Sequence, residues 1–195
     1  MDNYSYYKAL LRIQETQTVE PIRSREKIEE LKELVRRQSD RNYFLVVLGL
    51  NIGARIGDLL KLRVKDVRNK TYITLIEEKT NKTKRFKINK TLLQTINEYI
   101  YDKEDDEYLF PSQKGNLPIT RVQAYRILKE AGEKLGLENI GSHSLRKSMG
   151  YHMYQKNKDA EVLRRIFNHS SPSITQRYIG VSQDEIDRAI DDFSL

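Results

Sequence analysis

The segment SHSLRKSMGYHMY combines a histidine and an arginine at a spacing suited to binding phosphate. If Ser142 caps a helix, His143 and Arg146 lie three residues apart on one face of its first turn. The amide N–H groups at the start of a helix also favour an anion. The segment therefore predicts a phosphate site, with a solvated polar turn as the alternative interpretation.

Arg55 lies in the segment GARIGDLLKL, among apolar residues that make an unpaired guanidinium costly. Asp58 is close enough in sequence to be its partner, so the two could form a purely structural ion pair. The glycines of GLNIGARIG follow no strand and precede no Gly-Lys-Ser/Thr, which excludes a P-loop and a dinucleotide-binding turn. Small residues at this spacing instead favour close helix packing.

A third segment, IFNHSSPSITQRYIG, places His169 nine residues before Tyr178, with Pro172 between them. The chain has 12 tyrosines, so Tyr178 alone is uninformative. The remaining histidine, His152, lies nine residues after His143 and therefore on the opposite side of the same predicted helix. We expect His152 to be structural.

The composition excludes several kinds of site. The chain has no cysteine, which rules out disulfides, thiolate zinc sites and a cysteine nucleophile. It also lacks the spacing His-x-x-x-His and a cluster of carboxylates, so no metal site is indicated. No apolar run approaches the roughly 18 residues of a membrane span, and the N-terminal sequence lacks the apolar stretch of a signal peptide.

Positive charge is concentrated in the body of the chain. The net charge is +7, but the last fifteen residues hold five acids and one base. The preceding 180 residues hold 34 bases and 23 acids. A basic body is typical of a protein that binds a polyanion, although a lysine-rich surface without a partner is the alternative.

The patterns predict a mostly helical chain. Ser24 is expected to cap a helix whose apolar stripe includes Ile28 and Leu31, and Asp40 to cap a second, buried helix that stops at Gly53. Strands are predicted over 64–67, 71–77 and 84–89, with the polar tip EKTNKTK before the last. A loop is expected over 102–119, and helices over 56–62, 91–101, 120–135, 142–156, 159–167, 173–179 and 183–192. The predicted fold class is α+β, mostly helical, with one small three-stranded antiparallel sheet.

The order of these clusters along the chain resembles the tyrosine recombinase (phage integrase) family. GARIGDLLKL resembles the family's first arginine box, SHSLRKSMG its His-x-Leu-Arg box and FNHSSPSITQRYIG its His…Thr-x-x-Tyr box. EKTNKTKRFKIN resembles the lysine-bearing hairpin of the family. The boxes extend from residue 53 to residue 180, and they imply the fold of a tyrosine-recombinase catalytic domain.

The resemblance implies a role for the chemically active side chains of these boxes. The implied catalytic residues are Arg55, Lys79, His143, Arg146, His169 and Tyr178, with Tyr178 as the nucleophile. The two arginines suit the negative charge of a phosphorane, since guanidinium is permanently charged and binds two oxygens at once. Lys79 is the implied general acid, with Lys82 as its substitute, and His143 moves the proton of the tyrosine.

Further residues are expected to support this set. Asp58 is expected to hold Arg55 or a histidine, and Thr175 to cap the helix that carries Tyr178. Residues of the hairpin are expected to contact DNA, namely Lys82, Lys84 and Arg85. In this hairpin Lys84 stands where the family commonly has arginine.

The resemblance also predicts how the chain is organised. Residues 1–20 are expected to be an N-terminal arm or the end of a linker, 21–180 the catalytic domain and 181–195 an acidic tail helix. Family members usually carry a helical core-binding domain of about one hundred residues before the catalytic domain. The chain is therefore expected to be a lone catalytic domain or a naturally minimal member of the family.

The predicted function is site-specific DNA recombination, in which strands are cleaved and rejoined through a covalent 3′-phosphotyrosine. The resemblance implies that neither a metal nor ATP is needed, so no cofactor is expected. A type IB topoisomerase, which shares this chemistry, is one alternative. A DNA-binding accessory protein that has the fold without the activity is the other.

The predicted partner is double-stranded DNA, with no membrane partner. The resemblance implies self-association into a tetramer on DNA through the tail helix, whose apolar face includes Ile186, Ile190 and Phe193. Without DNA we expect this face to fold back on its own domain. The expected location is the cytoplasm of a bacterium, at the nucleoid, with the gene belonging to the bacterium or to a phage.

Overall fold

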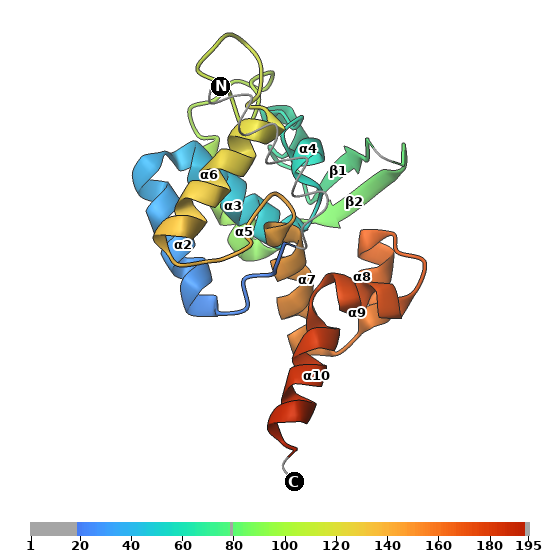
Figure 1. Cartoon of the computed structure of the whole chain (residues 1–195). Coiled ribbons are helices and arrows are strands. Elements are labelled where there is room, and N and C mark those ends of the chain that lie inside the picture. The colour runs from blue at the N-terminus through green and yellow to red at the C-terminus, as the bar shows by residue number, and fades with distance from the viewer. Residues whose placement is uncertain (1–18, 79, 194–195) are drawn as a thin grey trace.

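The computed structural model describes residues 19–78 and 80–193 of the chain. Helices dominate, and two strands form a hairpin that projects from the side of the helical body (Figure 1). In chain order the elements are α2 (Arg25–Gln38), α3 (Asp40–Ile52), α4 (Ile56–Leu59), the 3-10 turn η1 (Val64–Asp66), β1 (Tyr72–Ile76), β2 (Thr83–Lys87), α5 (Lys90–Tyr99), α6 (Arg121–Lys134), α7 (Ser144–Asn157), α8 (Ala160–Phe167), α9 (Pro172–Tyr178) and α10 (Val181–Asp191). The predicted mostly helical fold class is confirmed.

Helices α2 and α3 begin at serine caps. Ser24 accepts a hydrogen bond from the amide of Lys27, as its place before the apolar stripe predicts. The cap of α3 is Ser39, whose hydroxyl accepts from the amide of Arg41. The prediction that Asp40 caps this helix was wrong by one position, because Ser39 has the extended backbone of a cap and Asp40 is already helical.

Helix α3 is buried on most faces and stops at Gly53. The side chains of Phe44 and Leu48 are inaccessible to solvent. Gly53 has a φ of 62°, in the left-handed region that glycine adopts without strain, and its amide bonds to the carbonyl of Gly49. A Cβ at Gly49 would lie 2.7 Å from the side chain of Leu145 in α7. The predictions that Gly53 ends the helix and that the glycines allow close packing are confirmed.

The strands form a single antiparallel hairpin in which β1 pairs with β2 along its length. Ile73 lies opposite Phe86, and Leu75 lies opposite Lys84. Residues opposite each other share a face, and the burial of Ile73 and Leu75 identifies this face as the inner one. One lysine of the hairpin therefore points toward the helical body.

The predicted third strand over 64–67 does not form. Residues Val64–Asp66 make a 3-10 turn instead, in which the Asp66 carboxylate accepts a hydrogen bond from the amide of Arg63. Val64 and Val67 are buried, but a pattern this short fits a turn as well as a strand. The prediction of a three-stranded sheet was therefore wrong, and the described residues form a sheet of two strands.

The remaining predicted helices are present, with ends shifted by at most three residues. Ser142 does not cap α7 as predicted. The capping position is His143, and the hydroxyl of Ser144 accepts from the amide of Gly141. No helix within the described residues combines the length and the apolar character needed to cross a membrane.

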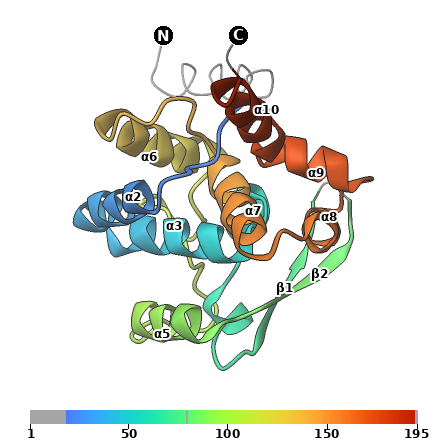
Figure 2. The same cartoon turned by 90° about the horizontal axis from the view of Figure 1, so that it is seen from below.

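The interior consists of two apolar clusters joined by α7. The larger cluster extends over α2 to α6 and the hairpin, and it reaches α7 through Leu145. The smaller cluster contains Tyr154 of α7 with four buried residues of the C-terminal helices, Leu163, Phe167, Ile179 and Val181. Helix α7 lies between the two groups of elements in both views (Figures 1 and 2). It therefore sets the position of the C-terminal helices relative to the rest of the chain.

The segment before α2 lies across α7. The amide of Ile22 donates to Oγ of Ser148 at 2.7 Å, and the Ser148 hydroxyl donates to the carbonyl of Ser144. Nε2 of His152 lies 2.9 Å from the carbonyl oxygen of Ile22. The structural role predicted for His152 is confirmed by this contact.

Helix α10 projects away from the body (Figure 1). Its first turn is held, since Val181 is buried in the smaller cluster and Asp184 pairs with Arg23 at 2.9 Å. Ile186 and Ile190 are 52% and 64% exposed. The expectation that the apolar face of the tail folds back on its own domain was therefore wrong.

The contact between α7 and the C-terminal helices yields a stability prediction. A Cβ on Gly150 would lie 2.7 Å from the Phe167 ring and 2.8 Å from the Ile179 side chain, both in the smaller cluster. Gly150→Ala should lower the free energy of unfolding by about 1–3 kcal/mol through overpacking, measured by chemical denaturation.

Gly57→Ala is the matched control, because a Cβ there meets only the flexible side chain of Arg121, at 3.1 Å. This variant should be as stable as the wild type or slightly more stable, since alanine favours a helix over glycine. Equal stability of the two variants would contradict the role assigned to Gly150.

Candidate active site

Arg146 is the most buried cation of the site. It comes from the first turn of α7 and is 3% exposed. Its NH1 donates to the carbonyl of Gly53 at 2.5 Å, and its NH2 donates to the carbonyl of Phe167 at 3.1 Å. These carbonyls fix the guanidinium between the end of α3 and the end of α8. Because carbonyl oxygens are neutral, the positive charge of Arg146 is not cancelled by them.

Arg55 lies two residues after Gly53, the glycine that ends α3, and occupies the capping position of α4. Its NH1 donates to Oε1 of Glu77 at 2.7 Å. Asp58, the predicted partner, instead accepts through Oδ1 from the amide of Glu78 at 3.0 Å. The predicted Arg55–Asp58 pair was wrong, since Asp58 ties α4 to the hairpin and Glu77 holds the arginine.

Lys84 enters the site from the inner face of β2. Its Nζ donates to the carbonyl of Ile166 in α8 and lies 3.5 Å from Oε1 of Glu77. Its side chain is only 15% exposed. Lys84 was predicted as one of the DNA contacts of the hairpin surface, but the alternation of β2 turns it inward.

The other basic residues predicted on the hairpin lie differently. Lys82 and Arg85 are exposed, and the Arg85 guanidinium lies 4.0 Å from the centroid of the Tyr72 ring. Both can reach a polyanion outside the site. Lys79, the implied general acid, lies outside the described residues.

His169 follows Asn168, which ends α8 with a φ of 58°. Nδ1 of His169 lies 3.1 Å from Oγ1 of Thr175, whose hydroxyl donates to the carbonyl of Ser171. Because a hydroxyl has one proton, the ring nitrogen must be the donor, which leaves Nε2 as an acceptor when the ring is neutral. Thr175 therefore orients His169. The cap of α9 is Ser171, so the predicted capping role of Thr175 was wrong.

Tyr178 ends α9 with its hydroxyl facing His143. The distance from Oη to Nδ1 of His143 is 3.4 Å. The tyrosine ring lies edge-on to His169, with 5.0 Å between the ring centroids, and the Nζ of Lys147 lies 5.1 Å from the same ring. Burial raises the pKa of Tyr178, although the nearby Arg146 acts in the opposite direction. The phenol is therefore protonated at neutral pH and needs a proton acceptor to become a nucleophile.

The charged groups of the site share one electrostatic field. Burial lowers the pKa of Lys84, Glu77 opposes this shift, and Arg146 and Arg55 add to it. Burial alone would raise the pKa of Glu77, but the Thr80 hydroxyl together with Lys84, Arg55 and Arg146 outweighs it and lowers this pKa. The site is thus an ionised carboxylate among cations, with an excess of positive charge that suits a phosphate.

Glu77 was not singled out by the sequence analysis. It is 3% exposed, although it lies at the base of a polar hairpin tip. The signal that could have found it is the alternation of side chains along a strand. Ile73, Leu75 and Glu77 are two residues apart and alternate with exposed residues, so they belong to one buried face. A carboxylate on the buried face of a strand requires a cation nearby.

The assembled groups can bind a phosphodiester and attack it. The guanidinium groups of Arg146 and Arg55 act electrostatically on the Tyr178 hydroxyl, and the imidazole of His143 lies 3.4 Å from it. Within the described residues, no group of three or more His, Asp or Glu side chains is placed to hold a metal ion. Fold and site together correspond to the class of DNA strand-transferring enzymes that use a tyrosine nucleophile.

Comparisons with known proteins agree with this class. The model of the phage integrase family matches residues 24–185, so the chain belongs to this family, the tyrosine recombinases. Over 166 residues it is 52% identical to the probable integrase/recombinase YoeC of Bacillus subtilis, covering 85% of this chain and 92% of that protein. It is 29% identical over 174 residues to the tyrosine recombinase XerA of Pyrococcus furiosus, covering 87% of this chain and 60% of XerA.

The fold is also that of a solved recombinase. The crystal structure of the XerH site-specific recombinase bound to a palindromic difH substrate matches with a TM-score of 0.67 at 20% identity, over 91% of this chain and 54% of the XerH chain. The chain thus spans nearly all of YoeC but only 60% of XerA and about half of XerH. The family match and the similarity to YoeC favour a site-specific recombinase over a type IB topoisomerase or an accessory protein.

The electrostatics of the site predict an unusual titration of His169. Burial, together with Arg146, Arg55 and Lys84, lowers the pKa of His169 to about 4. The ring should therefore remain neutral as the pH falls from 7 to about 5, in a nitrogen-detected NMR titration of the histidines. A phosphate that neutralises the arginines should raise this pKa.

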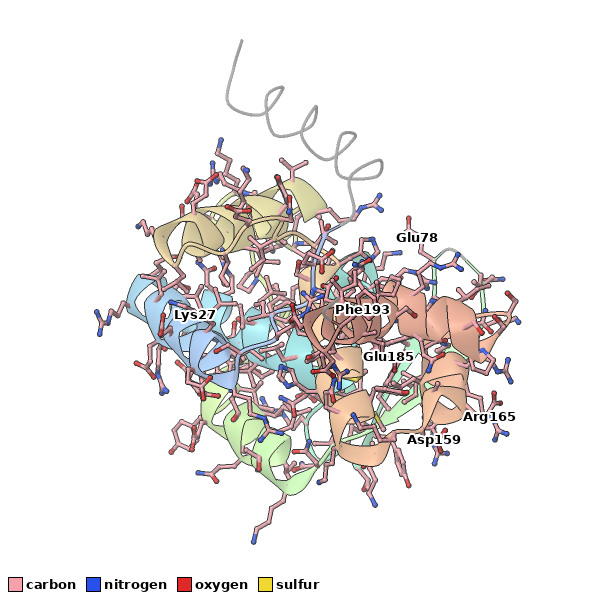
Figure 3. The ribbon with its side chains drawn as sticks, turned by 60° about the horizontal axis from the view of Figure 1, so that its bottom comes forward. Lys27, Glu78, Asp159, Arg165, Glu185 and Phe193 are labelled. Carbon is pink, nitrogen blue, oxygen red and sulfur yellow. The ribbon has the colours of Figure 1, made fainter. Side chains whose placement is uncertain are left out.

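Two variants test the origin of the shift. Arg55→Gln removes one of the cations and should raise the pKa of His169, whereas Arg165→Gln, whose side chain is 74% exposed, should leave it unchanged. Arg165 lies at the outer rim of the C-terminal helices in Figure 3. A His169 pKa near 6.5 in the wild type would contradict the described geometry.

Proposed function

We propose that the chain is the catalytic unit of a site-specific recombinase that cuts and rejoins DNA through a covalent bond to Tyr178. The observation that carries the proposal is the hydroxyl of Tyr178 lying 3.4 Å from His143, near enough to the guanidinium groups of Arg146 and Arg55 for their charges to act on its pKa. The catalytic unit is assigned to residues 21–180, preceded by an arm within 1–20 and followed by the tail helix within 181–195.

The roles of Tyr178 as nucleophile and His143 as base follow from the protonation state of the tyrosine. Tyr178 is a phenol at neutral pH, so Nδ1 of His143 accepts its proton as Oη attacks the phosphorus. The new bond joins Oη to the phosphorus, and the bond to the 5′-oxygen of the next nucleotide breaks. The products are a 3′-phosphotyrosine and a free 5′-hydroxyl. Attack by the 5′-hydroxyl of a second strand reverses the step and releases the tyrosine.

The arginines stabilise the charge that develops in this step. The phosphorane carries additional negative charge on its non-bridging oxygens, and permanently charged, pre-positioned donors stabilise it. Arg146 is fixed by two carbonyls and Arg55 by Glu77, so little reorganisation is needed. When the bound phosphate raises the pKa of His169 and the ring becomes protonated, Nε2 donates a hydrogen bond to the same phosphate.

The leaving 5′-oxygen needs a proton. Lys79 of the hairpin is assigned this role on its place in the family's lysine-bearing hairpin. Lys82, exposed at the hairpin tip, remains the substitute. With these side chains the reaction balances without a metal ion or ATP, because the phosphotyrosine conserves the energy of the broken bond.

The substrate is double-stranded DNA. The XerH recombinase that shares the fold was solved with a difH substrate, and the basic residues Lys82 and Arg85 of this chain are exposed beside the site. Since phosphate contacts dominate such binding, affinity should fall steeply with salt. With YoeC of Bacillus subtilis as a relative, we assign the activity to DNA in a bacterial cytoplasm.

The nucleophile is tested by trapping the adduct. With a nicked duplex in EDTA, the wild type should form a denaturant-stable protein–DNA band. Tyr178→Phe should abolish the band and change the DNA affinity by less than about twofold, since one hydroxyl is lost from many contacts. Tyr101→Phe, an exposed tyrosine elsewhere, is the control and should behave as the wild type. Undiminished cleavage by Tyr178→Phe would place the nucleophile elsewhere.

We also propose that α10 joins protomers on DNA. Ile186, Ile190 and Phe193 are 52%, 64% and 67% exposed, on a helix that leaves the body of the chain. Such a stripe is suited to a groove on a second copy. Four copies linked in this way would make the tetramer that exchanges two pairs of strands.

The role of the tail predicts different losses in two assays. Deletion of 182–195 should weaken recombination between two duplexes far more than cleavage of one. Ile190→Ser tests the same face while it leaves the Arg23–Asp184 ion pair in place, and it should have the same selective effect. Equal loss of cleavage and recombination would count against assembly through α10.

A further inference from the structure

Glu77 is the only carboxylate with direct contacts to two cations of the site among the described residues. Its Oε1 lies 2.7 Å from NH1 of Arg55 and 3.5 Å from Nζ of Lys84. Its Oε2 accepts a hydrogen bond from the hydroxyl of Thr80 at 2.7 Å. The side chain is 4% exposed, and each of its two carboxylate oxygens has a protein partner.

The contacts join three parts of the chain. Arg55 comes from the turn between α3 and α4, Lys84 from β2 and Thr80 from the tip of the hairpin. The backbone of Glu77 closes the same tip, because its amide donates to Lys82 and its carbonyl accepts from Asn81. A single residue therefore links the hairpin to the arginine.

We propose that Glu77 is a positioning residue that holds the Arg55 guanidinium in its reactive place, with the Lys84 ammonium beside it, before and during DNA cleavage. This inference rests on the proposed function and deepens it. Without the carboxylate, the two cations would repel each other and Arg146 across a partly buried space. The guanidinium of Arg55 would then lose its orientation.

The carboxylate does not compete with DNA for the arginine. A guanidinium has five N–H donors, and Glu77 uses the NH1 side of Arg55. The arginine side chain is 24% exposed, so its remaining donors can reach a phosphate. Displacing Glu77 would leave a buried, ionised carboxylate without its partner, which is costly. The carboxylate is therefore a permanent support.

Glu77 also holds the tip of the hairpin. Thr80 bonds to the carboxylate and Asn81 to the backbone carbonyl of Glu77. Lys79, the proposed general acid, lies between Glu77 and Thr80 in the sequence. Loss of the carboxylate should therefore affect the chemical step more than DNA binding.

The test compares neighbouring glutamates. Glu77→Gln keeps the size and removes the charge, whereas Glu78→Gln does the same one residue along, at an exposed side chain that pairs with Lys61. Glu78 lies at the edge of the molecule in Figure 3. At saturating DNA, Glu77→Gln should slow formation of the covalent adduct on the order of 10- to 100-fold, with DNA affinity changed less than about threefold. Glu78→Gln should match the wild type in both.

A double-variant cycle separates positioning from general damage. If Glu77 acts through Arg55, then Glu77→Gln should cost little more when Arg55 is already replaced by glutamine. Glu77→Asp keeps the charge and should recover part of the lost rate. Losses that multiply in the double variant, or an equal loss for Glu77→Asp and Glu77→Gln, would overturn the proposal.

A second measurement needs no DNA. The ammonium of Lys84 should titrate at a lower pKa in Glu77→Gln than in the wild type, because Glu77 raises that pKa, and Glu78→Gln should leave it unchanged. Carbon-detected NMR of the lysine side chains measures this shift. An unchanged Lys84 pKa in Glu77→Gln would refute the inference even if the wild type cleaves DNA. If Glu77→Gln shows the expected shift of the Lys84 pKa but the wild type forms no covalent adduct, only the proposed function is refuted.

Discussion

The structure depends on keeping several positive charges together in a partly buried space. Two like charges about 6 Å apart repel each other by about 3 kcal/mol at an effective dielectric constant of about 20. The chain opposes this repulsion in two ways. Neutral carbonyls of Gly53 and Phe167 hold Arg146 by geometry, while the ionised Glu77 holds Arg55 and Lys84 by charge. The repulsion that remains is relieved when a phosphate binds, so the site is prepared for its substrate.

The carbonyls and carboxylate come from segments far apart in sequence, and the fold brings them together through α7. This helix belongs to the larger apolar cluster through Leu145 and to the smaller one through Tyr154. Arg146 therefore lies where the end of α3 and the end of α8 can both reach it. The same arrangement delivers Tyr178 to His143, because α9 follows α8 on the smaller cluster. A shift of the C-terminal helices against α7 would separate the proposed nucleophile, Tyr178, from its proposed base, His143.

Protonation states follow from the same surroundings. Burial raises the pKa of Tyr178, and burial with neighbouring cations lowers that of His169 to about 4. The phenol and the imidazole are thus both neutral at pH 7 before DNA binds. The negative charge of a bound phosphate would raise the pKa of Tyr178, which disfavours the phenolate. It would also raise the pKa of His169, which favours the protonated ring. The arginines counter the first effect, because the positive charges of Arg146 and Arg55 act to lower the pKa of Tyr178.

Sequence reasoning succeeded where a signal is local. The Ser24 cap, the left-handed Gly53 and the apolar stripes predicted the first helices, and the ordered boxes singled out Tyr178 and His143, which lie together in the structure. It failed where the partner is distant. Asp58 was chosen for Arg55 by proximity, yet a partner 22 residues away was closer in space. Strand parity on the hairpin would have indicated Glu77 and Lys84, since each shares the face of a buried apolar neighbour.

The predictions for the tail helix and for the short segment over 64–67 were wrong for another reason. Their apolar residues predict burial but not the surface that buries them. Ile190 is 64% exposed in the single chain, and Val64 is buried in a turn instead of a strand. Neither outcome follows from periodicity, because both depend on neighbours that the sequence does not specify.

The most direct test of the account is to map the covalent adduct by mass spectrometry. The protein is trapped on a nicked duplex in EDTA, the DNA is digested by nuclease, and the peptides are sequenced. We expect one modified tryptic peptide, residues 178–188, with a nucleotide joined through its 3′-phosphate to Tyr178. A nucleotide on any other residue, or a 5′-phosphate linkage at Tyr178, would contradict the account.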